Sequence, residues 1–176
     1  MLNSKIEKAL NDQLALEALS SFHYLAMASW MENNGYMGTS RFLYNQVAEE
    51  HMHMMKLFHY INEAGGKALA PAVPQVSHDF RSYSLLFEEI LQNERRVSDA
   101  IHDLVDACLK EKDYTTFNFL QWYVAEQLEE ENLFKEINDK IRMLGDSKDS
   151  LYLLDRDLET MPNKAKISSI NSGYKG

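Results

Sequence analysis

The sequence predicts an all-α protein built as a four-helix bundle with one long crossover and a short fifth helix. Only three prolines and seven glycines interrupt the 176 residues, and 45% of the residues are hydrophobic, which favours long helices around one core. Apolar residues recur at helical spacing over four long stretches. Between the second and third stretches lies a long segment with Pro71 and Pro74 and no clear period.

The first helix is expected over about residues 4–33, where the turn formers Asn33, Asn34 and Gly35 stop it. Its apolar positions are Ile6, Leu10, Leu14, Tyr24, Ala28 and Met31. The second helix is expected after a short turn at residues 38–39, and the glycine pair at 65–66 closes it. The short turn makes these two helices antiparallel neighbours.

The segment from Gly65 to about Arg81 is unusually long for a loop inside a compact domain. An extended chain gains about 3.3 Å per residue, so the segment can reach roughly 50 Å, whereas a 28-residue helix is about 42 Å long. The segment can therefore run the full length of the bundle, which lets the second and third helices run parallel.

The third helix is expected over about residues 82–110, followed by a break at residues 112–113. The fourth helix then runs to Gly145, and a short fifth helix is expected over about residues 149–159. The fifth helix presents Leu151, Leu154 and Leu158 on one face.

We expect one domain over residues 1–159, with the bundle at about residues 4–144. The small and polar residues 160–176 are expected to be a disordered tail.

Composition excludes several classes of protein. A net charge of −9 argues against sequence-independent binding of nucleic acid, whose phosphates need basic patches, and favours cations as partners. No apolar run approaches transmembrane length and the N-terminus has no apolar signal core, so we expect a cytoplasmic protein with no membrane partner. The single cysteine, Cys108, excludes a disulfide framework and zinc sites built on cysteine pairs, and is expected to pack in the core.

Each of the four long helices carries an acidic interruption of its apolar stripe. These interruptions are Glu17, Glu50, Glu94, and the pair Glu126 and Glu130. Residues three or four apart share a helix face, so we expect these carboxylates to point toward the core. All lie near the midpoints of their helices and should meet at one level of the bundle. Because each buried unpaired charge costs several kcal/mol, the carboxylates should bind cations.

His53 adds a nitrogen ligand, because it follows Glu50 by three residues and lies about 60° round the helix from it. Glu50-x-x-His53 is therefore a chelating pair. A carboxylate-rich site with one imidazole and no thiolate suits iron or manganese, with zinc as a further candidate. Four helices that contribute such ligands form a di-metal carboxylate site.

Some of these residues allow other interpretations. The acidic run 126–131 taken alone would be a solvated helix face, but the matched interruptions in three other helices favour a metal site, with Glu131 left on the surface. Tyr24 and Trp122 are either ordinary core aromatics or residues that act beside the metal. The histidines and methionines expected to be structural or exposed are His23, His51, His59, His78, His102, Met52, Met54 and Met55.

On these residues the chain resembles the bacterial non-haem ferritins as far as about Glu159. The block 113–123, continuing through Glu126-Gln127 and Glu129-Glu130, carries the most specific match. The resemblance implies a ferroxidase that binds Fe(II), oxidises it with dioxygen or hydrogen peroxide, and stores Fe(III) as a mineral core. It also implies a hollow shell of 24 copies of the chain.

The resemblance further implies roles for particular residues. Glu17, Glu50 and His53 would form the first iron site, and Glu50 would bridge to a second site made by Glu94 and Glu130. Gln127 would lie beside them. A third site, with Tyr24 adjacent, would consist of Glu49, Glu126, Glu129 and Glu130.

The chain also departs from related families. Bacterioferritins repeat Glu-x-x-His on the fourth helix, where this chain has Gln127-x-x-Glu130, and they carry a haem-binding methionine at the position of His51. No haem is therefore expected. Animal ferritins line an entry channel with acids where this chain has Asn118 and Gln121, so that entry route is not expected to carry over.

Two alternatives remain. A di-iron redox or peroxidase enzyme of the rubrerythrin type is disfavoured by the third site and the fifth helix, and one cysteine cannot supply a rubredoxin-like domain. A purely structural bundle is disfavoured by the buried acids. The helix at residues 149–159 is left with two placements, along a fourfold axis of a cage or as a lid on its own bundle.

Overall fold

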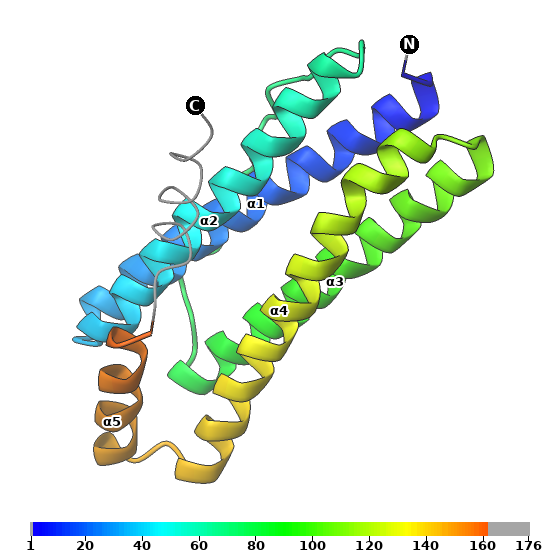
Figure 1. Cartoon of the computed structure of the whole chain (residues 1–176). Coiled ribbons are helices and arrows are strands. Elements are labelled where there is room, and N and C mark those ends of the chain that lie inside the picture. Colours follow the sequence, from blue (N-terminus) through cyan, green and yellow to red (C-terminus); the bar gives the residue numbers. More distant parts are fainter. Residues whose placement is uncertain (1, 162–176) are drawn as a thin grey trace, which may run out of the picture.

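The computed structural model describes residues 2–161, and within them only helices occur as regular secondary structure (Figure 1). Their bounds are α1 (Ser4–Asn33), α2 (Met37–Glu63), α3 (Tyr83–Glu111), α4 (Tyr114–Leu144) and α5 (Lys148–Glu159). The predicted all-α fold is confirmed, and the predicted bounds lie within one residue of the observed ones except at the start of α2. The predicted turn at residues 38–39 was wrong, because Gly38 and Thr39 lie inside α2, where Gly38 allows the close approach of α5 and forms no turn. Residues 162–176, most of the segment expected to be a tail, lie outside the described range.

Side-chain caps explain where the helices begin. Asn3, Ser82, Asp113 and Ser147 each accept a hydrogen bond from a backbone N–H of the first turn of the helix that follows. Ser82 is thus the cap of α3 and not its first helical residue. At the other end of α3, Lys112 takes the left-handed conformation with φ 57°, which turns the chain directly into α4.

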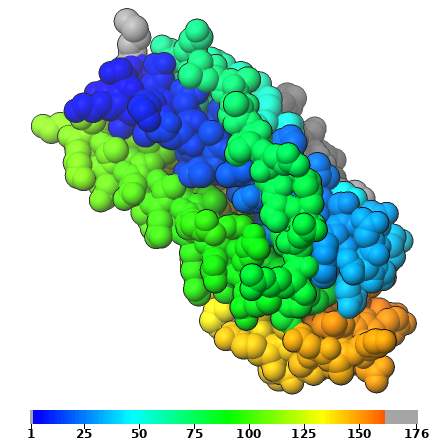
Figure 2. Space-filling view, turned by 180° about the vertical axis from the view of Figure 1, so that it is seen from behind, coloured from blue at the N-terminus to red at the C-terminus, as the bar shows by residue number. Residues whose placement is uncertain are grey.

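The long helices form two hairpins, α1 with α2 and α3 with α4, which pack together mainly through α1 and α3 (Figure 1). The segment between α2 and α3 runs along α1, as its length predicted. Asn11 donates to the Lys67 carbonyl and accepts from the Leu69 N–H, both at the start of that segment. At its far end the Phe80 ring meets Trp30 edge-on, with centroids 6.1 Å apart. Figure 2 shows the segment crossing the surface beside α1.

Helix α5 lies across the end of the bundle and contacts α2 and α4 (Figure 1). Leu151, Leu154 and Leu158 are buried there, so α5 covers the core of its own chain, one of the two expected placements. Asp155 also caps α2, where Tyr36 offers no side-chain cap. Its carboxylate accepts from the N–H groups of Gly38 and Thr39 at 3.1 and 2.7 Å.

The apolar core divides into two clusters, one at the α5 end and one at the opposite end. Phe87 and Phe134 are central to the first, while Leu57, Leu120 and the fully buried Cys108 belong to the second. Cys108 is therefore a core residue, as expected. The buried polar groups described below occupy the level between the clusters. No helix within residues 2–161 has the length and apolar composition to cross a membrane.

Candidate metal centre

The middle of the bundle gathers buried polar side chains from all four long helices. Each of them is at most 4% exposed, although most are ionisable. They are Glu17 of α1, Glu50 and His53 of α2, Glu94 of α3, and Gln127 and Glu130 of α4. The structure thus places four of the predicted acidic residues, Glu17, Glu50, Glu94 and Glu130, together at one level of the core.

Glu17, Glu50 and His53 form the tightest group, with one potential ligand atom from each lying within 4.8 Å of the others. His53 Nδ1 lies 3.8 Å from Glu17 Oε2 and 3.8 Å from Glu50 Oε2. These separations exceed a hydrogen bond and leave space for an ion among the three atoms. Glu17 Oε2 is buried and finds no hydrogen-bond donor within residues 2–161, which is the state expected of an oxygen that awaits a cation.

Neighbouring side chains hold this group in place. Gln13 Nε2 donates to the other oxygen of Glu17 at 2.8 Å. The Tyr123 hydroxyl donates to the His53 backbone carbonyl at 2.8 Å, and the Trp122 ring meets the imidazole edge-on with centroids 5.3 Å apart. The imidazole is therefore oriented before any metal arrives.

Glu94 is held at both of its carboxylate oxygens. The Tyr24 hydroxyl donates to Oε1 at 2.5 Å, and Gln127 Nε2 donates to Oε2 at 3.3 Å. Gln127 Nε2 also donates to the Glu94 backbone carbonyl at 3.1 Å. Tyr24 is therefore a direct partner of the centre, although sequence spacing had related it to Glu17.

Burial is the main cause of unusual acidities in the centre. Burial raises the pKa of Glu17, partly offset by the hydrogen bond from Gln13. It raises the pKa of Glu50 well above the ordinary value, helped by the charges of Glu94 and Glu17. The pKa of Glu94 rises to about 7, because burial outweighs the hydrogen bond from Tyr24. Binding a cation would replace these protons and remove the repulsion among the carboxylates.

A second group of potential ligand atoms consists of Glu49, His53 and Glu126, again within 4.8 Å of one another. Glu49 is 3% exposed and Glu126 half-buried, so this group lies nearer the surface than the first. Glu129 is exposed and belongs to neither group among the described residues. His53 in the second group was missed, although it follows Glu49 by four residues, a spacing that shares a helix face.

The prediction that Glu126 points toward the core with Glu130 was wrong. Residues 123, 127, 130 and 134 follow one another by four, three and four positions and are all buried. Glu126 precedes Gln127 by one residue and so lies about 100° round the helix from it. The residues that α4 contributes to the centre are therefore Gln127 and Glu130.

The remaining histidines behave as expected. Within residues 2–161 none of them joins either group of potential ligands. His51, His59, His78 and His102 are exposed, and His23 is half-buried.

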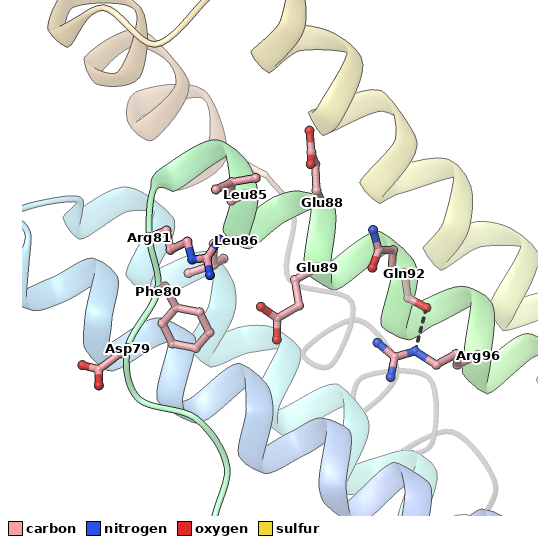
Figure 3. Close-up of a pocket in the computed structure, with 9 residues that line it drawn as sticks. All are labelled: Asp79, Phe80, Arg81, Leu85, Leu86, Glu88, Glu89, Gln92 and Arg96. Carbon is pink, nitrogen blue, oxygen red and sulfur yellow. Dashed lines mark hydrogen bonds between the residues drawn. The ribbon is translucent and has the colours of Figure 1, made fainter.

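A surface hollow of about 410 Å³ lies elsewhere, where the crossover segment meets the start of α3 (Figure 3). Its lining residues are Asp79, Phe80, Arg81, Leu85, Leu86, Glu88, Glu89, Gln92 and Arg96. None of the buried ligands lines it, and its three acids share the lining with two arginines. The candidate site is therefore the buried cluster and not this hollow.

Comparisons with known proteins agree with this geometry. A family model described as a ferritin-like domain matches residues 7–144. A probable bacterial non-haem ferritin-like protein of Haemophilus influenzae is 44% identical over 165 residues, covering 94% of this chain and 100% of the relative. A bacterial non-haem ferritin of Campylobacter jejuni is 39% identical over 161 residues, covering 92% of this chain and 96% of its own.

Among solved structures, an open-pore ferritin of the archaeon Archaeoglobus fulgidus matches with a TM-score of 0.90 at 39% identity, covering 92% of this chain and 100% of that one. The predicted ferritin-like bundle is thereby confirmed. Since the family model and full-length relatives match most of the sequence, the chain belongs to the ferritin family.

Proposed function

We propose that this protein is an iron-storage ferritin, which oxidises Fe(II) at the buried centre and keeps the Fe(III) as a mineral core inside a hollow shell. The observation that carries the proposal is the group of Glu17, Glu50 and His53 at the level of Glu94 and Glu130, inside a ferritin fold. Iron is the substrate and cargo of this chemistry.

The first Fe(II) would bind to Glu17, Glu50 and His53, and the second to Glu94 and Glu130, with Glu50 shared between them. The electrostatic coupling of Glu50 to Glu17, Glu94 and Glu130 supports the shared position. Carboxylates with one imidazole suit Fe(II). Two Fe(II) ions supply two electrons, the number that reduces dioxygen to hydrogen peroxide or hydrogen peroxide to water.

The second group, Glu49, His53 and Glu126, is proposed as the auxiliary iron position, with the exposed Glu129 beside it on α4. Because Glu126 is half-buried, this position offers iron a way between the centre and the surface. Glu130 connects the two positions on α4. Tyr24 is proposed to act beside the centre through its hydrogen bond to Glu94.

Storage requires a shell of many copies, for which we propose the 24-subunit cage of the family. Apolar side chains left exposed on one chain support subunit contacts. Four of them are Leu128, Met143, Tyr152 and Leu153, with exposures of 66%, 86%, 61% and 55%.

The test is aerobic addition of many Fe(II) equivalents per subunit, followed by separation of soluble particles and measurement of their iron. We expect oxidation to continue far beyond the capacity of the centre and the iron to remain soluble with the protein. If oxidation stops after two or three equivalents and no soluble core forms, the storage proposal fails. That outcome would favour the rubrerythrin-type alternative.

A further inference from the structure

A series of polar contacts links the surface of α3 and α4 to the buried Glu94. The Ser98 hydroxyl donates to Glu131 Oε1 at 2.5 Å. Gln127 Nε2 donates to Ser98 Oγ at 3.4 Å and to Glu94 Oε2 at 3.3 Å. At the outer end, Arg95 Nε lies 3.9 Å from Glu131 Oε2.

Burial increases along this series. The side chains of Arg95 and Glu131 are 59% and 34% exposed. Ser98 and Gln127 are each only 4% exposed, and Glu94 is 2% exposed. Buried polar groups need partners, so the inner members cannot rearrange without losing a hydrogen bond in a dry environment.

The direction of these hydrogen bonds follows from the chemistry of Glu131. An ionised carboxylate can only accept hydrogen bonds, so the single hydroxyl hydrogen of Ser98 is directed to Glu131. Ser98 Oγ then offers only lone pairs to Gln127. The Glu94 backbone carbonyl, 3.1 Å from Gln127 Nε2, also only accepts. Both partners therefore require Gln127 to present its NH₂ group and not its carbonyl oxygen.

The orientation of Gln127 matters because the same NH₂ group faces Glu94 Oε2. A reversed amide would place two oxygens against each other. In the observed orientation, Glu94 is held by two neutral donors, Tyr24 from α1 and Gln127 from α4. Neutral donors fix the carboxylate without cancelling its charge, so it remains able to bind a cation.

We propose that Ser98 and Glu131 are positioning residues, which orient the Gln127 amide and through it the Glu94 carboxylate that receives the second metal ion. The inference rests on the proposed ferroxidase function for its iron chemistry. It adds Glu131, which the sequence predicts to lie on the surface, and Ser98, for which the sequence predicts no role. Neither belongs to the group of Glu17, Glu50 and His53, so the first metal ion should bind independently of them.

The experiment compares metal binding in four variants, with Co(II) as the probe and its visible absorption as the readout. Glu131→Leu removes the acceptor that orients the Ser98 hydroxyl, and Ser98→Ala removes the hydroxyl itself. Glu131→Gln keeps an acceptor for Ser98. The matched control is Glu136→Leu, also on α4, whose carboxylate lies 3.1 Å from Lys140 and outside the centre.

In the unaltered protein we expect two binding steps at the centre, the first at Glu17, Glu50 and His53 and the second at Glu94 and Glu130, in addition to any binding at the auxiliary position. Glu131→Leu and Ser98→Ala should weaken the second step by about three- to tenfold and shift its absorption bands, with the first step unchanged. Glu131→Gln and Glu136→Leu should match the unaltered protein. In Fe(II) oxidation, Glu131→Leu should raise the Fe(II) concentration that gives half the maximal rate more than it lowers the maximal rate.

An unchanged second step in Glu131→Leu, or equal weakening of both steps, overturns the proposal. So does a Glu131→Gln variant that behaves like Glu131→Leu. Because Glu131 is one-third exposed, its variants are expected to fold, and they decide the question if Ser98→Ala does not. Co(II) binding needs no oxidation, so it tests the positioning role separately from storage. If Co(II) binds as expected but no mineral core forms with iron, only the storage proposal is overturned.

Discussion

His53 belongs to both groups of potential metal ligands among the described residues. Its Nδ1 lies at equal distances of 3.8 Å from carboxylate oxygens of two glutamates, one on its own helix and one on α1. Losing the imidazole therefore affects the centre and the auxiliary position together, whereas losing Glu49 affects only the latter.

We predict that His53→Ala slows the fast phase of Fe(II) oxidation by about tenfold or more, because the first ion loses its nitrogen ligand. Stopped-flow absorbance at a few Fe(II) equivalents per subunit measures this phase. His59→Ala removes an exposed imidazole from the same helix and should leave the rate unchanged. Equal rates in the two variants would count against the assigned centre.

The buried glutamates make stability depend on pH. The pKa of Glu94 is raised from its ordinary value of 4.5 to about 7, chiefly by burial. Between these values the folded chain keeps a proton that the unfolded chain has released, so the free energy of unfolding falls as pH rises. The raised pKa values of Glu17 and Glu50 act in the same direction.

Metal-free protein should therefore show a lower melting temperature at pH 8 than at pH 5, measured by calorimetry after removal of metal with a chelator. Glu94→Gln should reduce the difference, since the amide does not titrate. Added Co(II) should abolish it by replacing the protons. A melting temperature that rises steadily over this range in the metal-free protein would contradict the prediction.

At the scale of elements, the contact of α5 with the start of α2 depends on the absence of a side chain at Gly38. A Cβ built there would lie 2.1 Å from the Asp155 backbone carbonyl oxygen, far inside van der Waals contact. The close approach lets the Asp155 side chain reach the first N–H groups of α2 and the Thr39 hydroxyl, the latter at 2.8 Å. One residue of α5 therefore caps α2 and anchors α5.

We predict that Asp155→Ala destabilises the protein by about 1–2 kcal/mol, the usual effect of losing a helix cap. Gly38→Ala should cost more, because α5 must move away from α2. Urea unfolding followed by circular dichroism measures both. The control is Asp157→Ala, an exposed acid on the same helix. A similar loss in the control would show that helix charge, and not the cap, is responsible.

At the scale of the whole molecule, helix α5 has two faces with different roles. Its leucines at 151, 154 and 158 are buried against its own bundle. Tyr152 and Leu153 are 61% and 55% exposed on the single chain. An exposed apolar pair on a helix whose opposite face is buried is typical of a surface that contacts another copy of the chain.

The combined change Tyr152→Glu and Leu153→Glu is predicted to yield particles smaller than the proposed 24-subunit shell. The added carboxylates of neighbouring copies would repel one another where the α5 surfaces pack together. Electron microscopy and light scattering measure particle size. We expect hollow spherical particles for the unaltered protein. Lys8→Glu, at the opposite end of the bundle, also adds negative charge and should leave the particle intact. A hollow particle of unchanged size in the double variant would contradict this role of α5.

The sequence by itself determined the features that depend on neighbours along the chain. Helical spacing and turn residues located all five helices to within one residue except at the start of α2, and the length of the segment after Gly65 predicted the crossover. The chelating pair Glu50 and His53 follows from spacing within one helix. The level at which the acids meet follows from their positions near the midpoints of the helices, since the rise per residue is constant.

Only the tertiary structure decided which side chains meet across helices. The rotation of α4 about its axis buries Gln127 and Glu130 in place of Glu126. Neighbouring residues point about 100° apart round a helix, and the short polar stretch around residue 126 does not specify which of them faces the core. Gly38 and Asp155 meet although they are 117 positions apart. The contacts of Ser98 with Glu131 and Gln127 likewise require two packed helices, because each depends on the relative rotation and depth of both.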